Sequence, residues 1–126
     1  MIWSVAFGSA LGGVCRWLIG AAFQRPGFPV WTLAINVAGS FLLGAILRGS
    51  LQTPSVSPEL RAMLTIGFCG GFTTFSTFSY ETATLLEDGQ WGKAALYIGG
   101  SVVLSIAAMF MGFAAARELV AVSARG

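Results

Sequence analysis

Residues 67–81 read GFCGGFTTFSTFSYE, and this stretch decides the fold of the chain. It overlaps a segment, 62–80, that carries no charge and is long enough to cross a bilayer. Yet residues 67–81 contain three glycines and six hydroxyl side chains. Because lipid offers no hydrogen-bond partner, polar groups and broken backbone at membrane depth are buried in protein or line a cavity. We therefore interpret this stretch as a permeation or ion-binding element.

The composition places the whole chain in a membrane. Of its 126 residues, 56% are hydrophobic and 10% are charged, whereas soluble domains carry about 25% charged residues. A membrane-spanning helix needs roughly 20 mostly apolar residues, so the apolar stretches predict four spans, at about 2–23, 29–49, 58–86 and 92–118. These spans use nearly all of the sequence. We therefore expect an all-α membrane protein in which residues 1–126 form a single transmembrane domain.

The sequence has few of the signals that mark a secreted, metal-binding or nucleic-acid-binding protein. A cleaved signal peptide is the alternative to the first span, but no basic region precedes the apolar run and further spans follow it. Cys15 and Cys69 are too far apart to suggest a metal motif, and we interpret them as small buried hydrophobic residues. The net charge is +2 and the chain has no basic run, so we expect no nucleic-acid partner.

The basic residues orient the chain only weakly. Four spans put both termini on one side, and basic residues near span ends favour the cytoplasmic side. The terminal side carries four arginines, and the opposite side carries two or three basic residues. This small difference leaves two possibilities open: all copies insert in one orientation, or copies insert in both orientations. Two oppositely oriented copies could pair about an axis in the membrane plane, as inverted repeats do. The residues counted are Arg48, Arg61, Arg117 and Arg125, against Arg25, Lys93 and, if it reaches the far headgroups, Arg16.

The third span is predicted to be interrupted. Its three glycines weaken the helix, and we expect a break between Gly70 and Phe75, with half-helices at about 58–69 and 75–86. Carbonyl groups at the end of the first half favour a cation, whereas the N-terminus of the second half favours an anion. A kinked but continuous helix, packed through its glycines, is the alternative.

Aromatic and hydroxyl side chains alternate after this break. Phe75 and Phe78 share a helix face, and Thr74 and Thr77 lie close to a neighbouring face. A phenyl ring has a positive edge, so ring edges could stabilise an anion weakly, as conduction requires. Ordinary aromatic packing is the alternative.

Two further spans carry polar stripes at helical spacing. Hydrogen bonds between helices, or local bonds to the carbonyls of the same helix, would explain these stripes. A path for a small anion, which exchanges its bound water for hydrogen bonds from neutral side chains, would explain them as well. No His, Lys or Asp is expected at mid-membrane, which argues against a proton relay and against an enzyme. The stripes are Thr32, Asn36 and Ser40 in the second span, and Tyr97, Ser101 and Ser105 in the fourth.

The first span pairs a small-residue motif with one charge. Gly8 and Gly12 are four apart, a spacing that lets two membrane helices approach closely. Arg16 follows four residues later. Two interpretations of Arg16 stay open, one in which it reaches the lipid headgroups and one in which it faces an aqueous vestibule and attracts anions.

Together these motifs resemble the fluoride channel family, called Fluc or CrcB, over essentially the full length of the chain. The third-span stretch from Gly67 to Glu81 is similar nearly residue for residue, which makes that match highly specific. Departures are Gly13 and Trp17, where Ala and Tyr are expected, and Trp31, where a Gly often stands. The other matching motifs are Gly8-x-x-x-Gly12-Gly13-x-x-Arg16 and Thr32-Leu33-x-x-Asn36-x-x-Gly39-Ser40-x-x-x-Gly44.

The resemblance implies an antiparallel, dual-topology homodimer with two anion pores in the bacterial inner membrane, which exports fluoride passively. It also implies a structural Na⁺ at the dimer centre, held by main-chain carbonyls that match Gly70 and Thr73. The residues that match the fluoride path are Phe75, Phe78, Asn36, Thr32, Ser101, Ser105, Tyr97, Thr74, Thr77 and, near the vestibule, Arg16.

Two other functions are alternatives to a fluoride channel. A transporter of the small multidrug-resistance type also has four spans and dual topology, but its proton exchange needs an intramembrane carboxylate. The first span has none, and we expect Glu81 to lie toward a helix end. A non-transporting assembly subunit would leave the hydroxyl stripes unexplained.

Overall fold

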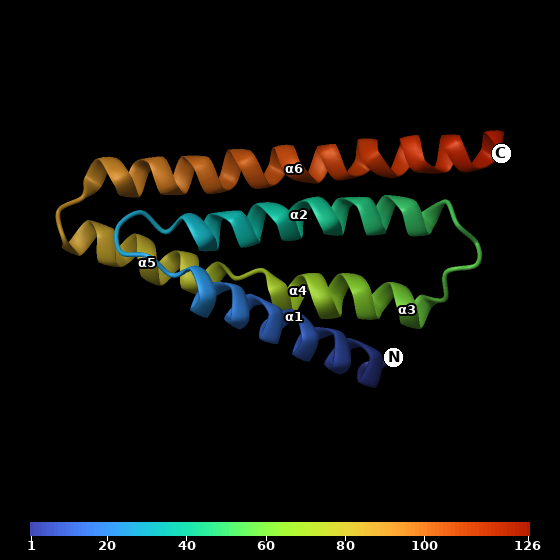
Figure 1. The fold of residues 1–126 in the computed structure, drawn as a ribbon, viewed down its shortest axis with the longest axis horizontal. Coiled ribbons are helices and arrows are strands. Elements are labelled where there is room, and N and C mark those ends of the chain that lie inside the picture. The colour runs from blue at the N-terminus through green and yellow to red at the C-terminus, as the bar shows by residue number, and fades with distance from the viewer.

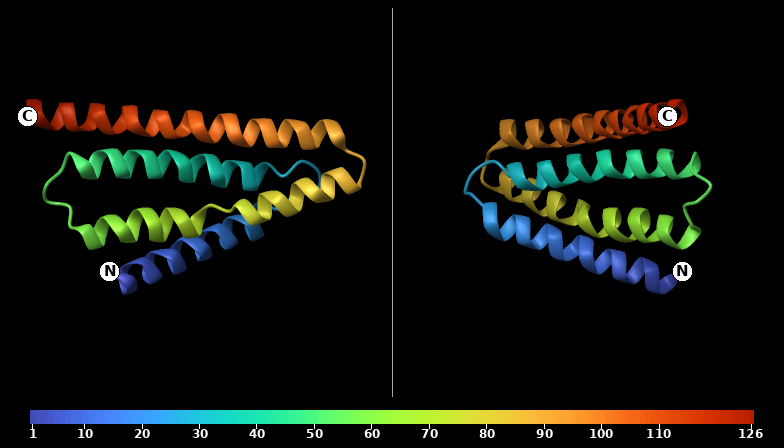
Figure 2. Two further views of the ribbon diagram at one scale, coloured as in Figure 1. Left: turned by 180° about the vertical axis from the view of Figure 1, so that it is seen from behind. Right: turned by 45° about the vertical axis from the view of Figure 1, so that its right-hand side comes forward.

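The computed structural model describes residues 1–126 as helices joined by short connections, with both termini at one end of the molecule (Figure 1). Three helices are long and apolar enough to cross a membrane. They are α1 (Ile2–Phe23), α2 (Val30–Leu51) and α6 (Trp91–Arg125). The third passage along the chain, made of shorter helices, lies between α2 and α1 in each view (Figure 2). The predicted all-α fold with an interrupted third span is confirmed.

The helix bounds follow the predicted spans closely, apart from the last. α6 has 35 residues, or about 50 Å at 1.5 Å per residue, so it is longer than the roughly 30 Å hydrocarbon core of a bilayer. It continues past residue 118 because residues 119–125 contain no glycine or proline to end it.

The third passage starts as an ordinary helix and then changes character. Ser57 Oγ accepts the N–H of Leu60 at 3.1 Å, with Pro58 at the first helical position. The passage then consists of α3 (Pro58–Ala62), the π-helical stretch η1 (Met63–Cys69), α4 (Gly70–Phe72) and α5 (Phe75–Glu87).

The interruption consists of two extended residues, Thr73 and Thr74. Their φ and ψ angles are −83° and 159°, and −151° and 117°. The alternative of a continuous, kinked helix is therefore wrong. The predicted first half, 58–69, is also three residues too short, because the helix continues to Phe72.

Gly67 and Gly71 pack against α1, whereas Gly70 is exposed, and none of the three glycines breaks the helix. The prediction that the glycines break the helix is therefore wrong. A Cβ atom on Gly67 would lie 2.9 Å from the Val5 carbonyl oxygen, and one on Gly71 would collide with the backbone of Ser9. On the α1 side, a Cβ atom on Gly8 would collide with the backbone of Met63, and one on Gly12 would collide with the backbone of Phe68. The small residues therefore bring the two backbones together, as in membrane helix pairs.

The second close pair consists of α2 and α6, which lie side by side along most of α2 (Figure 1). Gly44 contacts the backbone of Met109, and Gly112 contacts that of Phe41. Near the terminal end, the Arg48 guanidinium lies 4.3 Å from the centre of the Phe113 ring. The interrupted passage therefore lies between α1, against which it packs, and the pair of α2 and α6 (Figure 1).

Candidate functional site

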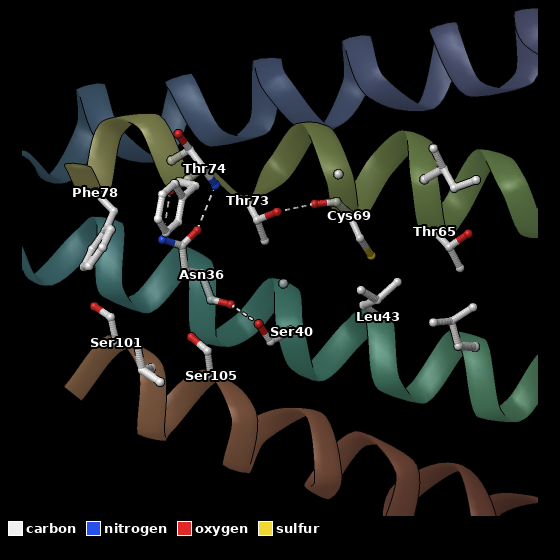
Figure 3. A pocket seen from close by; sticks show the side chains of 16 residues that line it. Asn36, Ser40, Leu43, Thr65, Cys69, Thr73, Thr74, Phe78, Ser101 and Ser105 are labelled. Carbon is white, nitrogen blue, oxygen red and sulfur yellow. Dashed lines mark hydrogen bonds between the residues drawn. The ribbon is translucent and has the colours of Figure 1, made fainter. Parts of the chain in front are cut away.

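The interruption is held by a side chain of α2. The Asn36 amide nitrogen donates to the Thr74 carbonyl at 3.1 Å, and its oxygen accepts the Thr74 N–H at 2.8 Å (Figure 3). One amide thus satisfies both main-chain groups of an extended residue. Of the two interpretations of Asn36, the interhelical hydrogen bond is thus present, and the residue also lines a cavity.

The main-chain carbonyls around the interruption differ in their partners. The Cys69 carbonyl accepts both the N–H and the Oγ–H of Thr73, at 3.0 and 2.9 Å. The Gly71 carbonyl accepts the Arg16 Nε–H at 3.1 Å. No hydrogen bond reaches the Thr73 carbonyl, and the Thr74 N–H, which would reach Gly70 in a continuous helix, bonds to Asn36. The Gly70 and Thr73 carbonyls are therefore open to another ligand.

Cavity 1, of about 690 Å³, lies between α2, α6 and this interruption (Figure 3). Ser101 is 7% exposed, and its Oγ is buried with no hydrogen-bond partner. Ser40 Oγ instead donates to the Asn36 carbonyl at 2.7 Å, a bond within its own helix. The predicted site residues that line cavity 1 are Asn36, Gly70, Thr73, Thr74, Phe75, Phe78, Ser101 and Ser105.

Two phenyl rings of α5 face this cavity. Their centres are 5.5 Å apart at an interplanar angle of 43°. Phe75 is 80% exposed, whereas Phe78 also contacts the Tyr97 ring, with a distance of 5.1 Å between centres. Phe75 therefore projects from the chain, and Phe78 is held against α6.

Cavity 2, of about 990 Å³, opens on the other side of Thr74, toward the loop between α1 and α2. Arg16, Thr32, Thr77 and Glu81 all line it. Arg16 therefore lines a cavity and also contacts the end of the first half-helix. Because Thr74 lines both cavities, the interruption separates them by a single residue.

Tyr97 is the one predicted path residue that lines neither cavity. Its side chain is fully buried, and its hydroxyl donates to Glu81 Oε1 at 3.2 Å. The rings of Phe28 and Phe78 flank it. Tyr97 thus connects α6 to the carboxyl that lines cavity 2.

Comparison with known proteins identifies the family of the chain. The family described as "CrcB-like protein, Camphor Resistance (CrcB)" matches residues 3–113. The chain belongs to the CrcB family. A relative from Geobacter sulfurreducens, named "Fluoride-specific ion channel FluC", is 50% identical over 121 residues, 94% of this chain and 98% of the relative. A relative from Chlorobium luteolum with the same name is 46% identical over 115 residues, 90% and 89% of the two chains.

Membership of the CrcB family and the three long apolar helices identify a multi-pass membrane protein. The CrcB match also includes the interruption itself, since the matched residues extend through α5. The residues of the candidate site therefore lie within the matched part of the chain.

Some features of this CrcB site escaped sequence reasoning. Glu81 was expected toward a helix end, but it lies in the middle of α5, within reach of Tyr97. The bond between Arg16 and Gly71 joins residues 55 positions apart. No local spacing signals such a contact, and of the two residues only Arg16 was predicted as a site residue.

Proposed function

We propose that the chain is a fluoride-selective ion channel, not an enzyme, and that it exports fluoride passively across the bacterial inner membrane as one transmembrane domain of residues 1–126. The observation that carries the proposal is the interruption at Thr73 and Thr74, with neutral donors and ring edges beside it. The names of relatives up to 50% identical over nearly the whole chain support it.

Cavity 1 suits fluoride because a fluoride ion that loses its water there would gain hydrogen bonds from neutral donors of the protein. The unpartnered Ser101 hydroxyl and the Asn36 amide supply hydrogen bonds, and the Phe75 and Phe78 ring edges add weak positive potential. Without a fixed positive charge in this cavity, the anion binds loosely enough to leave. Arg16 in cavity 2 raises the local anion concentration at the vestibule.

The surface that a single chain leaves exposed supports a homodimer. Gly70 is exposed beside the interruption, and Phe75 is 80% exposed. Interrupted backbone at membrane depth is tolerated only against protein or water, so a second copy is expected to cover it. The weak bias of basic residues favours an antiparallel, dual-topology pair, in which each copy contributes to two pores.

The same surface suits a structural Na⁺ on the axis of the pair. The Gly70 and Thr73 carbonyls, one set from each copy, would hold it. Their lack of partners within the chain fits this role, because Na⁺ prefers oxygen ligands and broken membrane helices commonly coordinate it through unwound carbonyls. The cation would neutralise the carbonyl dipoles that face each other at the axis.

Fluoride efflux from liposomes that contain the purified protein tests the proposal, with chloride efflux measured alongside. We expect fluoride efflux well above that from empty liposomes, and little chloride efflux. Phe75→Ile and Phe78→Ile should abolish or sharply reduce it, whereas Phe7→Ile, an exposed phenyl ring that lines neither cavity, should not. Efflux equal to that of empty liposomes would refute the channel, and transport that depends on a pH gradient would favour the multidrug-type transporter.

A further inference from the structure

The two hydrogen bonds between Asn36 and Thr74 affect more than helix packing. In a continuous α-helix the N–H of residue i+4 bonds to the carbonyl of residue i, so the Thr74 N–H would bond to the Gly70 carbonyl. Here that N–H donates to Asn36 Oδ1 at 2.8 Å. The amide of α2 therefore takes the donor that would otherwise occupy the Gly70 oxygen.

The same bond orients the Thr73 carbonyl. The Thr73 C=O and the Thr74 N–H belong to one peptide unit, and in a planar trans peptide they point in opposite directions. Because Asn36 holds the N–H toward α2, the Thr73 carbonyl points away from α2. The Thr73 N–H and Oγ–H both go to Cys69, so neither one competes for the Gly70 oxygen.

The second bond fixes the next peptide unit. Asn36 Nδ2 donates to the Thr74 carbonyl at 3.1 Å, and Thr74 Oγ1 accepts the Thr77 N–H at 3.2 Å to begin α5. Rotation of the peptide between Thr73 and Thr74 would break the bond from the Thr74 N–H to Asn36 Oδ1, and the contacts of Thr74 on its other side hold that residue in place. The geometry of the two open carbonyls is thus set from outside the interrupted passage.

We infer that Asn36 is a positioning residue for the cation site, one that keeps the Gly70 and Thr73 carbonyls open through its hydrogen bond with the Thr74 N–H. The inference rests on the proposed structural Na⁺. It gives the Asn36 oxygen a role in cation binding, separate from any contact of its N–H groups with the permeating anion.

The test measures Na⁺ binding directly, without fluoride flux. The thermal unfolding midpoint of the purified full-length protein in detergent is followed as Na⁺ replaces N-methyl-D-glucamine at constant ionic strength, which yields an apparent Na⁺ affinity. Asn36→Leu has similar volume but no acceptor, so its Na⁺ affinity should fall by about tenfold or more, as expected for the loss of hydrogen bonds that hold the site. Asn36→Asp keeps an acceptor for the Thr74 N–H and should retain Na⁺ affinity within a few-fold of wild type.

Ser40→Ala is the matched control, because Ser40 lines the same cavity and bonds only within its own helix. Its Na⁺ affinity should equal that of wild type. If the wild-type protein gains no stability from Na⁺, the proposed cation site itself fails. If wild type responds and Asn36→Leu responds equally, the inference is wrong. If Asn36→Leu does not fold, Asn36→Asp decides, since loss of its Na⁺ response in a folded protein would contradict the role of the acceptor oxygen.

Discussion

The Nε–H of Arg16 donates to the main-chain carbonyl of Gly71 at 3.1 Å, which joins α1 to the last turn before the interruption. The carbonyl end of a helix carries partial negative charge and stabilises a cation. Arg16 also lines cavity 2. One side chain therefore contacts the end of the first half-helix and the cavity that we propose as the vestibule for the anion.

Replacement of Arg16 separates these two effects. Arg16→Gln removes the charge, and we expect fluoride efflux to fall several-fold at low ionic strength, because the vestibule attracts fewer anions. The deficit should shrink in high salt, which screens such attraction. Arg16→Lys keeps the charge and should recover most of the efflux. Equal efflux by all three proteins in dilute buffer would contradict a role for this charge.

The glycine contacts between α1 and the third passage predict a sharp difference between two glycines of one helix. A Cβ on Gly8 would collide with the Met63 carbonyl, whereas a Cβ on Gly20 would meet nothing within 4 Å. Gly8→Ala should lower the free energy of unfolding by about 1–3 kcal/mol, as overpacking does, while Gly20→Ala should leave it nearly unchanged. Thermal unfolding in detergent provides the comparison, and similar midpoints for the two variants would show that the helices separate at little cost.

Sequence patterns predicted the helices of this fold well, because uncharged apolar runs and helix-start signals act locally. They also placed the interruption within a few residues. The glycine prediction was wrong because a glycine in a sequence can mark either a break in a helix or a close contact between two helices. Only the partner backbone, such as that of Val5 against Gly67, distinguishes the two.

The candidate site was predictable as a set of residue types and not as a geometry. The stripe of Tyr97, Ser101 and Ser105 places three hydroxyls on one helix face, yet only the two serines line cavity 1. Tyr97 instead turns its hydroxyl to Glu81 of α5. Helical spacing fixes the direction of a side chain, whereas its partner depends on how the helices pack.

The contact between Arg48 and Phe113 predicts a measurable coupling between α2 and α6. With 4.3 Å between the guanidinium carbon and the ring centre, the pair should contribute about 0.5–2 kcal/mol. A double-mutant cycle with Arg48→Leu and Phe113→Leu isolates this energy. Strictly additive unfolding energies would show that the contact contributes nothing.

Substitutions of Tyr97 test the hydrogen bond that connects α6 to Glu81, a residue that lines cavity 2. Tyr97→Phe keeps the ring between Phe28 and Phe78 but removes the donor to Glu81, so the free energy of unfolding should fall by only about 1 kcal/mol. Tyr97→Ala empties a fully buried site and should cost about 3–5 kcal/mol. Unfolding midpoints measured side by side give both values, and a Phe variant as unstable as the Ala variant would mean that the hydroxyl, rather than the ring, dominates.

Substitution of Ser101 should affect fluoride efflux and the stability of the fold differently. Its Oγ is buried without a hydrogen-bond partner, a state that costs free energy in the folded chain. Ser101→Ala should therefore leave the unfolding midpoint unchanged or raise it, while fluoride efflux falls because cavity 1 loses a neutral donor. Ser105→Ala, one turn further along α6 in the same cavity, provides the comparison in the same assay. A destabilised Ser101→Ala protein with normal efflux would show that this hydroxyl serves the fold and not the anion.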